Sequence, residues 1–212
     1  MMKRICLLAL SIIMLLSMAG CGSSGASDGG KKETGEKTSA PAQTSKLQTE
    51  RGKALVVYFS CTGNTKRAAQ YASDILGADL YEITPEVPYT SNDLNYHDET
   101  TRATVEQKDS SVRPAIVGDV ADFDQYDTVV LAFPIWWGQE PRILDTFMES
   151  HDFGGKTIVP MCTSNSSDMG SSADFLKAVT KGSAKWLQGK RFPVNVAKED
   201  IHSWLNDVGL AK

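Results

Sequence analysis

Apolar runs that alternate with helical stretches constrain the fold of this chain more than any other feature of its sequence. The clearest runs are apolar without a break, which indicates strands that are buried on both faces of a sheet. The expected strands are Lys53–Phe59, Asp79–Thr84, Thr128–Phe133, Thr157–Cys162 and a weaker run at Ala184–Gln188 that extends toward Phe192. The expected helices are Thr65–Leu76, Pro141–Ser150, Ser171–Thr180 and Lys198–Val208. Because such alternation implies right-handed crossovers, we predict an α/β fold with a doubly wound, five-stranded parallel sheet.

Residues Pro85–Tyr126 interrupt the alternation with a long, polar stretch that is rich in turn residues. One helix fits within it, around Asp93–Lys108, and Arg102 is spaced to pair with Glu99 or with Glu106. We expect a surface insertion that carries a solvated helix. A wall above a substrate pocket is the alternative role for this segment.

The first 20 residues have the layout of a secretory signal. Lys3 and Arg4 precede the apolar stretch Ile5–Met18, which is too short and too poorly flanked for a membrane-spanning helix. The residues Met18–Cys21 resemble a bacterial lipobox, which implies that Cys21 is lipidated and becomes the new N-terminus. Two acyl chains are enough for a stable membrane anchor. An ordinary cleaved signal, in which Cys21 has no role, is the alternative.

Composition divides the rest of the chain into a tether and one domain. Residues 21–52 begin with the lipidated cysteine, are rich in Gly, Ser, Thr, Lys and Glu, and contain Leu47 as their only large apolar residue. This composition is typical of a flexible tether. Residues 53–212 suffice for one domain with a real core. They hold 15 Lys and Arg against 22 Asp and Glu, a formal charge of −7. An acidic domain disfavours nucleic acid and favours a protein partner with a basic surface.

The cysteines and histidines predict neither a disulfide nor a metal site in this domain. Cys61 and Cys162 end separate expected strands, and the three histidines are scattered without the spacing of metal ligands. Cys61 lies close to an expected helix N-terminus, which would lower the pKa of a redox-reactive thiol. The simpler interpretation is a small residue that fits a tight loop.

The corner between the first strand and the first helix is suited to hold a phosphate. It consists of Ser60, Cys61, Thr62, Gly63, Asn64 and Thr65. A helix N-terminus presents unpaired backbone N–H groups and the positive end of a dipole, and a glycine lets the backbone approach the anion closely. The corner lacks the lysine of a nucleoside-triphosphate loop, and the chain has no G-x-G-x-x-G motif. We therefore expect one terminal phosphate on a larger molecule.

Two further loops follow the third and fourth strands, at the same edge of the sheet. The first contains Pro134, Ile135, Trp136, Trp137 and Gly138, and the second contains Thr163, Ser164, Asn165, Ser166 and Asp168. Ligands of doubly wound sheets bind beyond the carboxyl ends of the strands. Indoles offer a stacking face, and polar loop groups can bond the edge of a ring. These loops favour a planar aromatic ring system with a phosphorylated side chain. For the tryptophans, anchoring of the next helix or a partner interface is the alternative.

The motifs Ser60–Thr65 and Phe133–Gly138 make the chain resemble a flavodoxin, specifically the short flavodoxin-like proteins with a Pro-Ile-Trp-Trp-Gly loop. The resemblance covers most of Lys53–Leu210. It implies the strand order 2-1-3-4-5 and non-covalent FMN. It places the 5′-phosphate on the first loop and the isoalloxazine ring against the loops at Pro134 and Thr163. Relatives usually carry several glycines in the third loop, where this chain has Asn165, Ser166 and Asp168.

The resemblance and the N-terminal signal together predict an FMN-binding electron-transfer protein. We expect lipid to anchor it to the outer face of a bacterial cytoplasmic membrane. No residue stands out as a general acid, base or nucleophile, so we expect an electron carrier rather than a substrate-specific oxidoreductase. Two alternatives are an NAD(P)H- or quinone-dependent FMN reductase and a surface lipoprotein that binds a partner without flavin.

Overall fold

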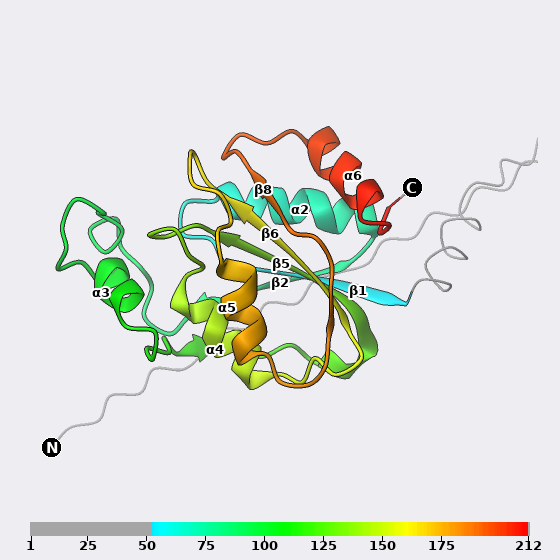
Figure 1. Cartoon of the computed structure of the whole chain (residues 1–212), viewed down its shortest axis with the longest axis horizontal. Helices are drawn as coiled ribbons and strands as arrows, with labels where there is room; N and C mark the ends of the chain where they lie inside the picture. The colour runs from blue at the N-terminus through cyan, green and yellow to red at the C-terminus, as the bar shows by residue number, and fades with distance from the viewer. Residues whose placement is uncertain (1–51, 212) are drawn as a thin grey trace, which may run out of the picture. The chain divides into compact units, whose positions relative to one another are not determined.

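The computed structural model describes residues 52–211, and the expected signal, Cys21 and most of the tether lie outside the described residues (Figure 1). The main sheet consists of β1 (Lys53–Tyr58), β2 (Asp79–Glu82), β5 (Tyr126–Pro134), β6 (Thr157–Thr163), β7 (Lys185–Trp186) and β8 (Lys190–Phe192). Its order is β2-β1-β5-β6-β7, with β8 also paired to β6, and every pair is parallel. This arrangement confirms the predicted doubly wound α/β fold and the strand order 2-1-3-4-5.

Four helices cover the two faces of the sheet, close to the positions that the sequence predicts. Helices α2 (Asn64–Leu76) and α6 (Lys198–Asp207) lie on one face, and α4 (Arg142–Ser150) and α5 (Ser172–Val179) lie on the other (Figure 1). Val56 and Tyr58 of β1 pack into the core beneath α2 and α6, whereas Leu55 and Val57 pack into the core beneath α4 and α5. Burial on both faces is the physical reason for the unbroken apolar runs.

The expected fifth strand is broken into two short strands, β7 and β8. Both pair with β6, on either side of Pro160. Proline has no backbone N–H, and the ladder to β5 continues past it, so the pairing is lost on the β7 and β8 side. The chain passes this point at Gly189, where an added Cβ would lie 2.7 Å from Cγ of Pro160.

The second strand also differs from the prediction, because Thr84–Pro85 (β3) leaves the main sheet and pairs antiparallel with Ile116–Val117 (β4).

The prediction of a solvated helix in the insertion is wrong in extent and in exposure. Helix α3 spans only Arg102–Lys108, and residues 93–101 form turns in which Asp93 and Asp98 accept hydrogen bonds from nearby backbone N–H groups. Asx and Thr side chains that bond the local backbone compete with a helix. Four of the seven residues of α3 are buried, namely Ala103, Thr104, Glu106 and Gln107. The Arg102–Glu106 pair forms at 2.6 Å, whereas Glu99 pairs with Lys108.

Within residues 52–211, no helix combines the length and the apolar character that crossing a membrane requires.

Candidate functional site

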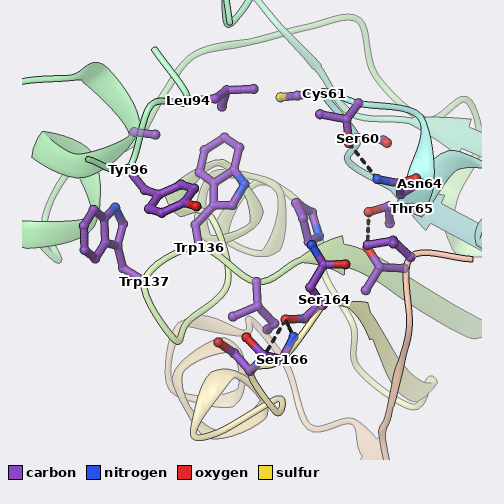
Figure 2. Close-up of a pocket in the computed structure, with 18 of the residues that line it drawn as sticks. Ser60, Cys61, Asn64, Thr65, Leu94, Tyr96, Trp136, Trp137, Ser164 and Ser166 are labelled. Carbon is purple, nitrogen blue, oxygen red and sulfur yellow. Dashed lines mark hydrogen bonds between the residues drawn. The ribbon is translucent and has the colours of Figure 1, made fainter. Parts of the chain in front are cut away.

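A cavity of about 610 Å³ opens at the carboxyl edge of the sheet, where β1, β5 and β6 end (Figure 2). Its volume is within the range of about 300–1,000 Å³ that is usual for small-molecule sites. The strand order reverses between β1 and β5, which is where doubly wound folds bind ligands. The lining residues are Ser60, Cys61, Thr62, Asn64, Thr65, Leu94, Tyr96, Ala103, Thr104, Pro134, Ile135, Trp136, Trp137, Gly138, Thr163, Ser164, Asn165, Ser166, Ser167 and Val194. No ionisable acid or base other than Cys61 and Tyr96 is among them.

One end of the cavity is the N-terminus of α2. Gly63 is the N-cap in the left-handed conformation (φ 83°), and no side chain caps the helix. The backbone N–H groups of Asn64, Thr65 and Lys66 have no acceptor among the described residues. Free N–H groups at a helix N-terminus, together with the helix dipole, attract an anion. Lys66 does not supply charge to the cavity, since its Nζ pairs with Glu82 at 3.1 Å.

A buried hydrogen bond joins the first loop to the third. The hydroxyls of Thr65 and Thr163 lie 2.8 Å apart, and both residues are buried. Beyond Thr163, the Ser164 hydroxyl accepts hydrogen bonds from the backbone N–H groups of Ser166 and Ser167 at 3.3 and 3.0 Å. The third loop therefore curls into a polar rim that faces the helix N-terminus across the cavity (Figure 2).

Cys61 lines the cavity from the first loop but lacks the features of a reactive thiol. Burial raises the pKa of its thiol to about 12, although the residue as a whole is exposed. A thiol with a raised pKa carries little thiolate at neutral pH. The raised pKa disfavours the redox-reactive alternative and agrees with the simpler interpretation of Cys61 as a small residue in a tight loop. Cys61 and Cys162 are both free, and β5 separates the strands that they follow or end.

The opposite end of the cavity is lined by aromatic side chains, and two of them, Trp136 and Trp137, lie on a tight turn. Trp136 and Gln139 exchange two backbone hydrogen bonds of 2.9 and 3.0 Å, and Trp137 and Gly138 between them both have positive φ (52° and 77°). This combination is that of a type I′ turn, which normally carries Asn-Gly. The Trp136 ring packs edge-on against Phe59 and Tyr89, at 5.5 and 5.1 Å between centroids. Trp137 is 49% exposed and borders the cavity (Figure 2).

Both tryptophans therefore line the cavity, but they differ in how they are held. Trp136 is half-buried and packs against the core, whereas Trp137 is largely exposed at the edge of the cavity. A non-glycine residue with positive φ is uncommon, and for a bulky side chain it costs about 1–3 kcal/mol. Among residues 52–211, Trp137 and Asp122 are the two such residues.

The insertion walls the cavity, the alternative role that the sequence left open for it, although the residues that form the wall were not predicted. Leu94, Tyr96, Ala103 and Thr104 line the cavity, and the ring of Tyr96, which is 66% exposed, lies beside Trp136 and Trp137 (Figure 2). Val194 and Ser167 were also missed. Val194 follows β8, so the rule that ligands sit beyond the carboxyl ends of strands points to it. The insertion residues carry no comparable signal, because the sequence does not reveal where a long loop returns.

Most of the predicted site residues meet at this cavity. All of them line it except Gly63, which is the N-cap of α2, and Asp168.

A buried carboxyl lies next to the tryptophan turn. The carboxyl of Glu140 is completely buried 3.4 Å from Arg142, and burial raises its pKa to about 7. Among residues 52–211, no group of three or more His, Cys, Asp or Glu residues is placed to hold a metal ion.

The polarity of the cavity fits FMN. Unpaired N–H groups of α2 at one end suit a phosphate group without a cation. The face of Trp137 at the other end suits the flat ring system, and the polar third loop suits its edge. Asn64, Thr65 and Thr62 would hold the phosphate, and Trp137 would hold the ring. The neutral lining matches a cofactor that is held by hydrogen bonds and stacking.

Comparison with known proteins agrees with this geometry. The model of the family described as flavodoxin matches residues 53–208. A candidate flavoprotein from Bacteroides eggerthii is 40% identical, with 74% of this chain and 98% of that chain covered and a TM-score of 0.68. A candidate flavoprotein from Bacteroides uniformis is also 40% identical, with 73% and 98% covered and a TM-score of 0.69.

A more distant solved structure shares the fold. The flavoprotein from Lactobacillus acidophilus, solved in complex with FMN, is 18% identical, with 66% of this chain and 93% of that chain covered and a TM-score of 0.52. None of the curated proteins matches the chain. Because the family model spans nearly all of the described residues and the two Bacteroides proteins align with this chain over nearly their full length, this chain belongs to the flavodoxin family.

Proposed function

We propose that this protein binds FMN non-covalently in the cavity at the carboxyl edge of the sheet and acts as an electron carrier. The observation that carries the proposal is the cavity itself. It joins three unpaired N–H groups of α2 at one end to the exposed ring of Trp137 at the other. Bound FMN would supply the one- and two-electron chemistry. The chain would hold the phosphate, support the ring and exclude water from one face of it.

The electrostatics of the domain favour transfer to another protein. Residues 53–212 carry a formal charge of −7, and no charged residue lines the cavity. An acidic surface attracts a redox partner with a basic surface and raises the rate of encounter. The neutral cavity leaves the flavin edge near Trp137 as the point of electron exit.

Purification of the chain with added FMN tests this function. We expect a yellow protein that retains FMN through gel filtration, quenches tryptophan fluorescence on binding, and bleaches when it is photoreduced without oxygen. Quenching is expected because Trp136 and Trp137 lie at the cavity. A colourless protein that fails to take up FMN would refute the proposal. It would favour the alternative of a surface lipoprotein that binds a partner without flavin.

An FMN reductase is the second candidate, and the insertion favours it. Leu94, Tyr96 and Thr104 of the insertion wall the cavity, which a simple carrier does not need. Steady-state oxidation of NAD(P)H, or NAD(P)H-driven reduction of a quinone, by the purified protein with FMN would support this candidate. Reduction of the flavin only through another protein would support the carrier.

We also propose that the protein is an extracytoplasmic lipoprotein, with Cys21 acylated. The support is the sequence of the first 21 residues, with its basic start, apolar stretch and lipobox-like Met18–Cys21. Replacement of Cys21 by alanine is expected to move the protein from the membrane fraction to the soluble fraction. The variant would lack the two acyl chains, and the polar tether has no apolar surface to bind the membrane in their place. Unchanged membrane retention of Cys21→Ala would contradict the anchor.

A further inference from the structure

The strained conformation of Trp137 requires a support, because a free turn would relax. The two turn residues have positive φ, and the first of them is a tryptophan rather than asparagine or glycine. Sterics penalise this conformation in L-residues by roughly 1–2 kcal/mol. Only two backbone hydrogen bonds, between Trp136 and Gln139, belong to the turn itself.

The support comes from one side chain of the insertion. The amide Nε2 of Gln107, in the last turn of α3, donates 2.9 Å hydrogen bonds to the carbonyls of both Trp136 and Glu140. These carbonyls flank the turn on its two sides. Gln107 is 6% exposed, so the two bonds are shielded from water. A single NH₂ group therefore clamps both strands of the turn.

The two carbonyl acceptors fix the orientation of the Gln107 amide, and this orientation leaves one buried atom of the side chain without a partner. Two carbonyl acceptors on one side require the NH₂ group to face the turn, since the opposite orientation would bring oxygen against oxygen. The Oε1 atom is then buried without a partner. An unpaired buried acceptor is destabilising. Gln107 therefore leaves one of its own atoms unpaired in order to donate both of the bonds that hold the turn.

The same helix also borders the cavity. Ala103, which lies four residues before Gln107 and on the same side of α3, lines the pocket. At the other end of the clamp, Arg142 donates from Nη2 to the carbonyl of Gln107 at 3.3 Å and to the side chain of Gln139 at 3.0 Å. The insertion, the turn and the start of α4 thus form one rigid unit.

We propose that Gln107 is a positioning residue for the flavin ring: it holds the Trp136–Gln139 turn so that Trp137 presents its indole face to the cavity. This inference rests on the proposed binding of FMN and assigns to the insertion a part in it. Gln107 does not line the cavity, so in this proposal it acts on the flavin through the turn that carries Trp137.

A double-mutant cycle tests the inference. Gln107→Met keeps the length and helix propensity of the side chain but removes both donors. We expect it to weaken FMN binding about tenfold, measured by quenching of flavin and tryptophan fluorescence. In a chain that already carries Trp137→Asn, the same change is expected to weaken binding by less than about twofold, because the residue through which Gln107 acts is gone.

The controls separate this role from a general loss of structure. Gln70 is exposed in the middle of α2, and Gln70→Leu is expected to leave FMN affinity unchanged. Gln107→Leu repeats the cycle if Gln107→Met fails to fold. Equal effects of Gln107→Met with and without Trp137 would overturn the inference, as would unchanged affinity, while wild-type binding would still support the proposed function. Absence of FMN binding in the wild type would refute the proposed function instead.

Discussion

Replacement of Gly63 by valine is expected to weaken FMN binding by a factor on the order of 100 or more while the domain stays folded. Gly63 has φ 83°, and the space next to it is open, since an added Cβ would meet no atom within 4 Å. The effect therefore comes from the backbone and not from a clash. A β-branched residue does not tolerate positive φ, so the loop would turn its N–H groups away from the phosphate.

A graded series at Gly63 makes this test specific. Asparagine tolerates the left-handed conformation, so Gly63→Asn should bind FMN more tightly than Gly63→Ala, and Gly63→Ala more tightly than Gly63→Val. Binding is measured by fluorescence titration and by the rise in melting temperature on addition of FMN. At a concentration of 100 times its Kd, a ligand stabilises a protein by about 2.7 kcal/mol. Equal affinity across the series would show that the corner does not hold the phosphate.

The sequence predicts the sheet and its helices well because their determinants are local and repeated. Unbroken apolar runs such as Val129–Phe133 show burial on two faces, and Gly77 ends α2 in the left-handed conformation that favours glycine. The broken fifth strand was not predictable from its own residues. Its break depends on Pro160 in the neighbouring strand, and the pairing of the two strands is a property of the fold.

The candidate site also contains parts that local sequence predicts and parts that depend on the fold. The loops at Ser60, Pro134 and Thr163 were predicted because each follows a strand, and parallel strands bring their carboxyl ends to one edge. A wall formed by the insertion was one of the alternatives, but its residues were not predicted, because nothing local to Leu94 or Tyr96 reveals the contact. The burial of α3 was also missed, since Glu106 and Gln107 are polar in sequence and become buried only through Tyr89 and the carbonyls of the turn.

Trp137→Asn is expected to change stability and binding in opposite directions. Asparagine is the residue that a type I′ turn favours, so the free energy of unfolding of the protein without FMN should rise by about 1 kcal/mol. FMN affinity should fall about 30-fold, because stacking between an aromatic side chain and a flat ring contributes about 1–3 kcal/mol. Urea denaturation measures the first effect, and fluorescence titration measures the second.

Trp136 provides the contrast that identifies which indole faces the flavin. Its half-buried ring packs against Phe59 and Tyr89, so Trp136→Ala should lower the free energy of unfolding by about 2 kcal/mol, less than the loss of a fully buried aromatic side chain. A gain of stability with a loss of affinity is therefore expected only at Trp137. If Trp137→Asn stabilised the protein and bound FMN as tightly as the wild type, Trp137 would not be the stacking residue. The strain of the turn would then need another explanation, such as contact with a redox partner at this exposed indole.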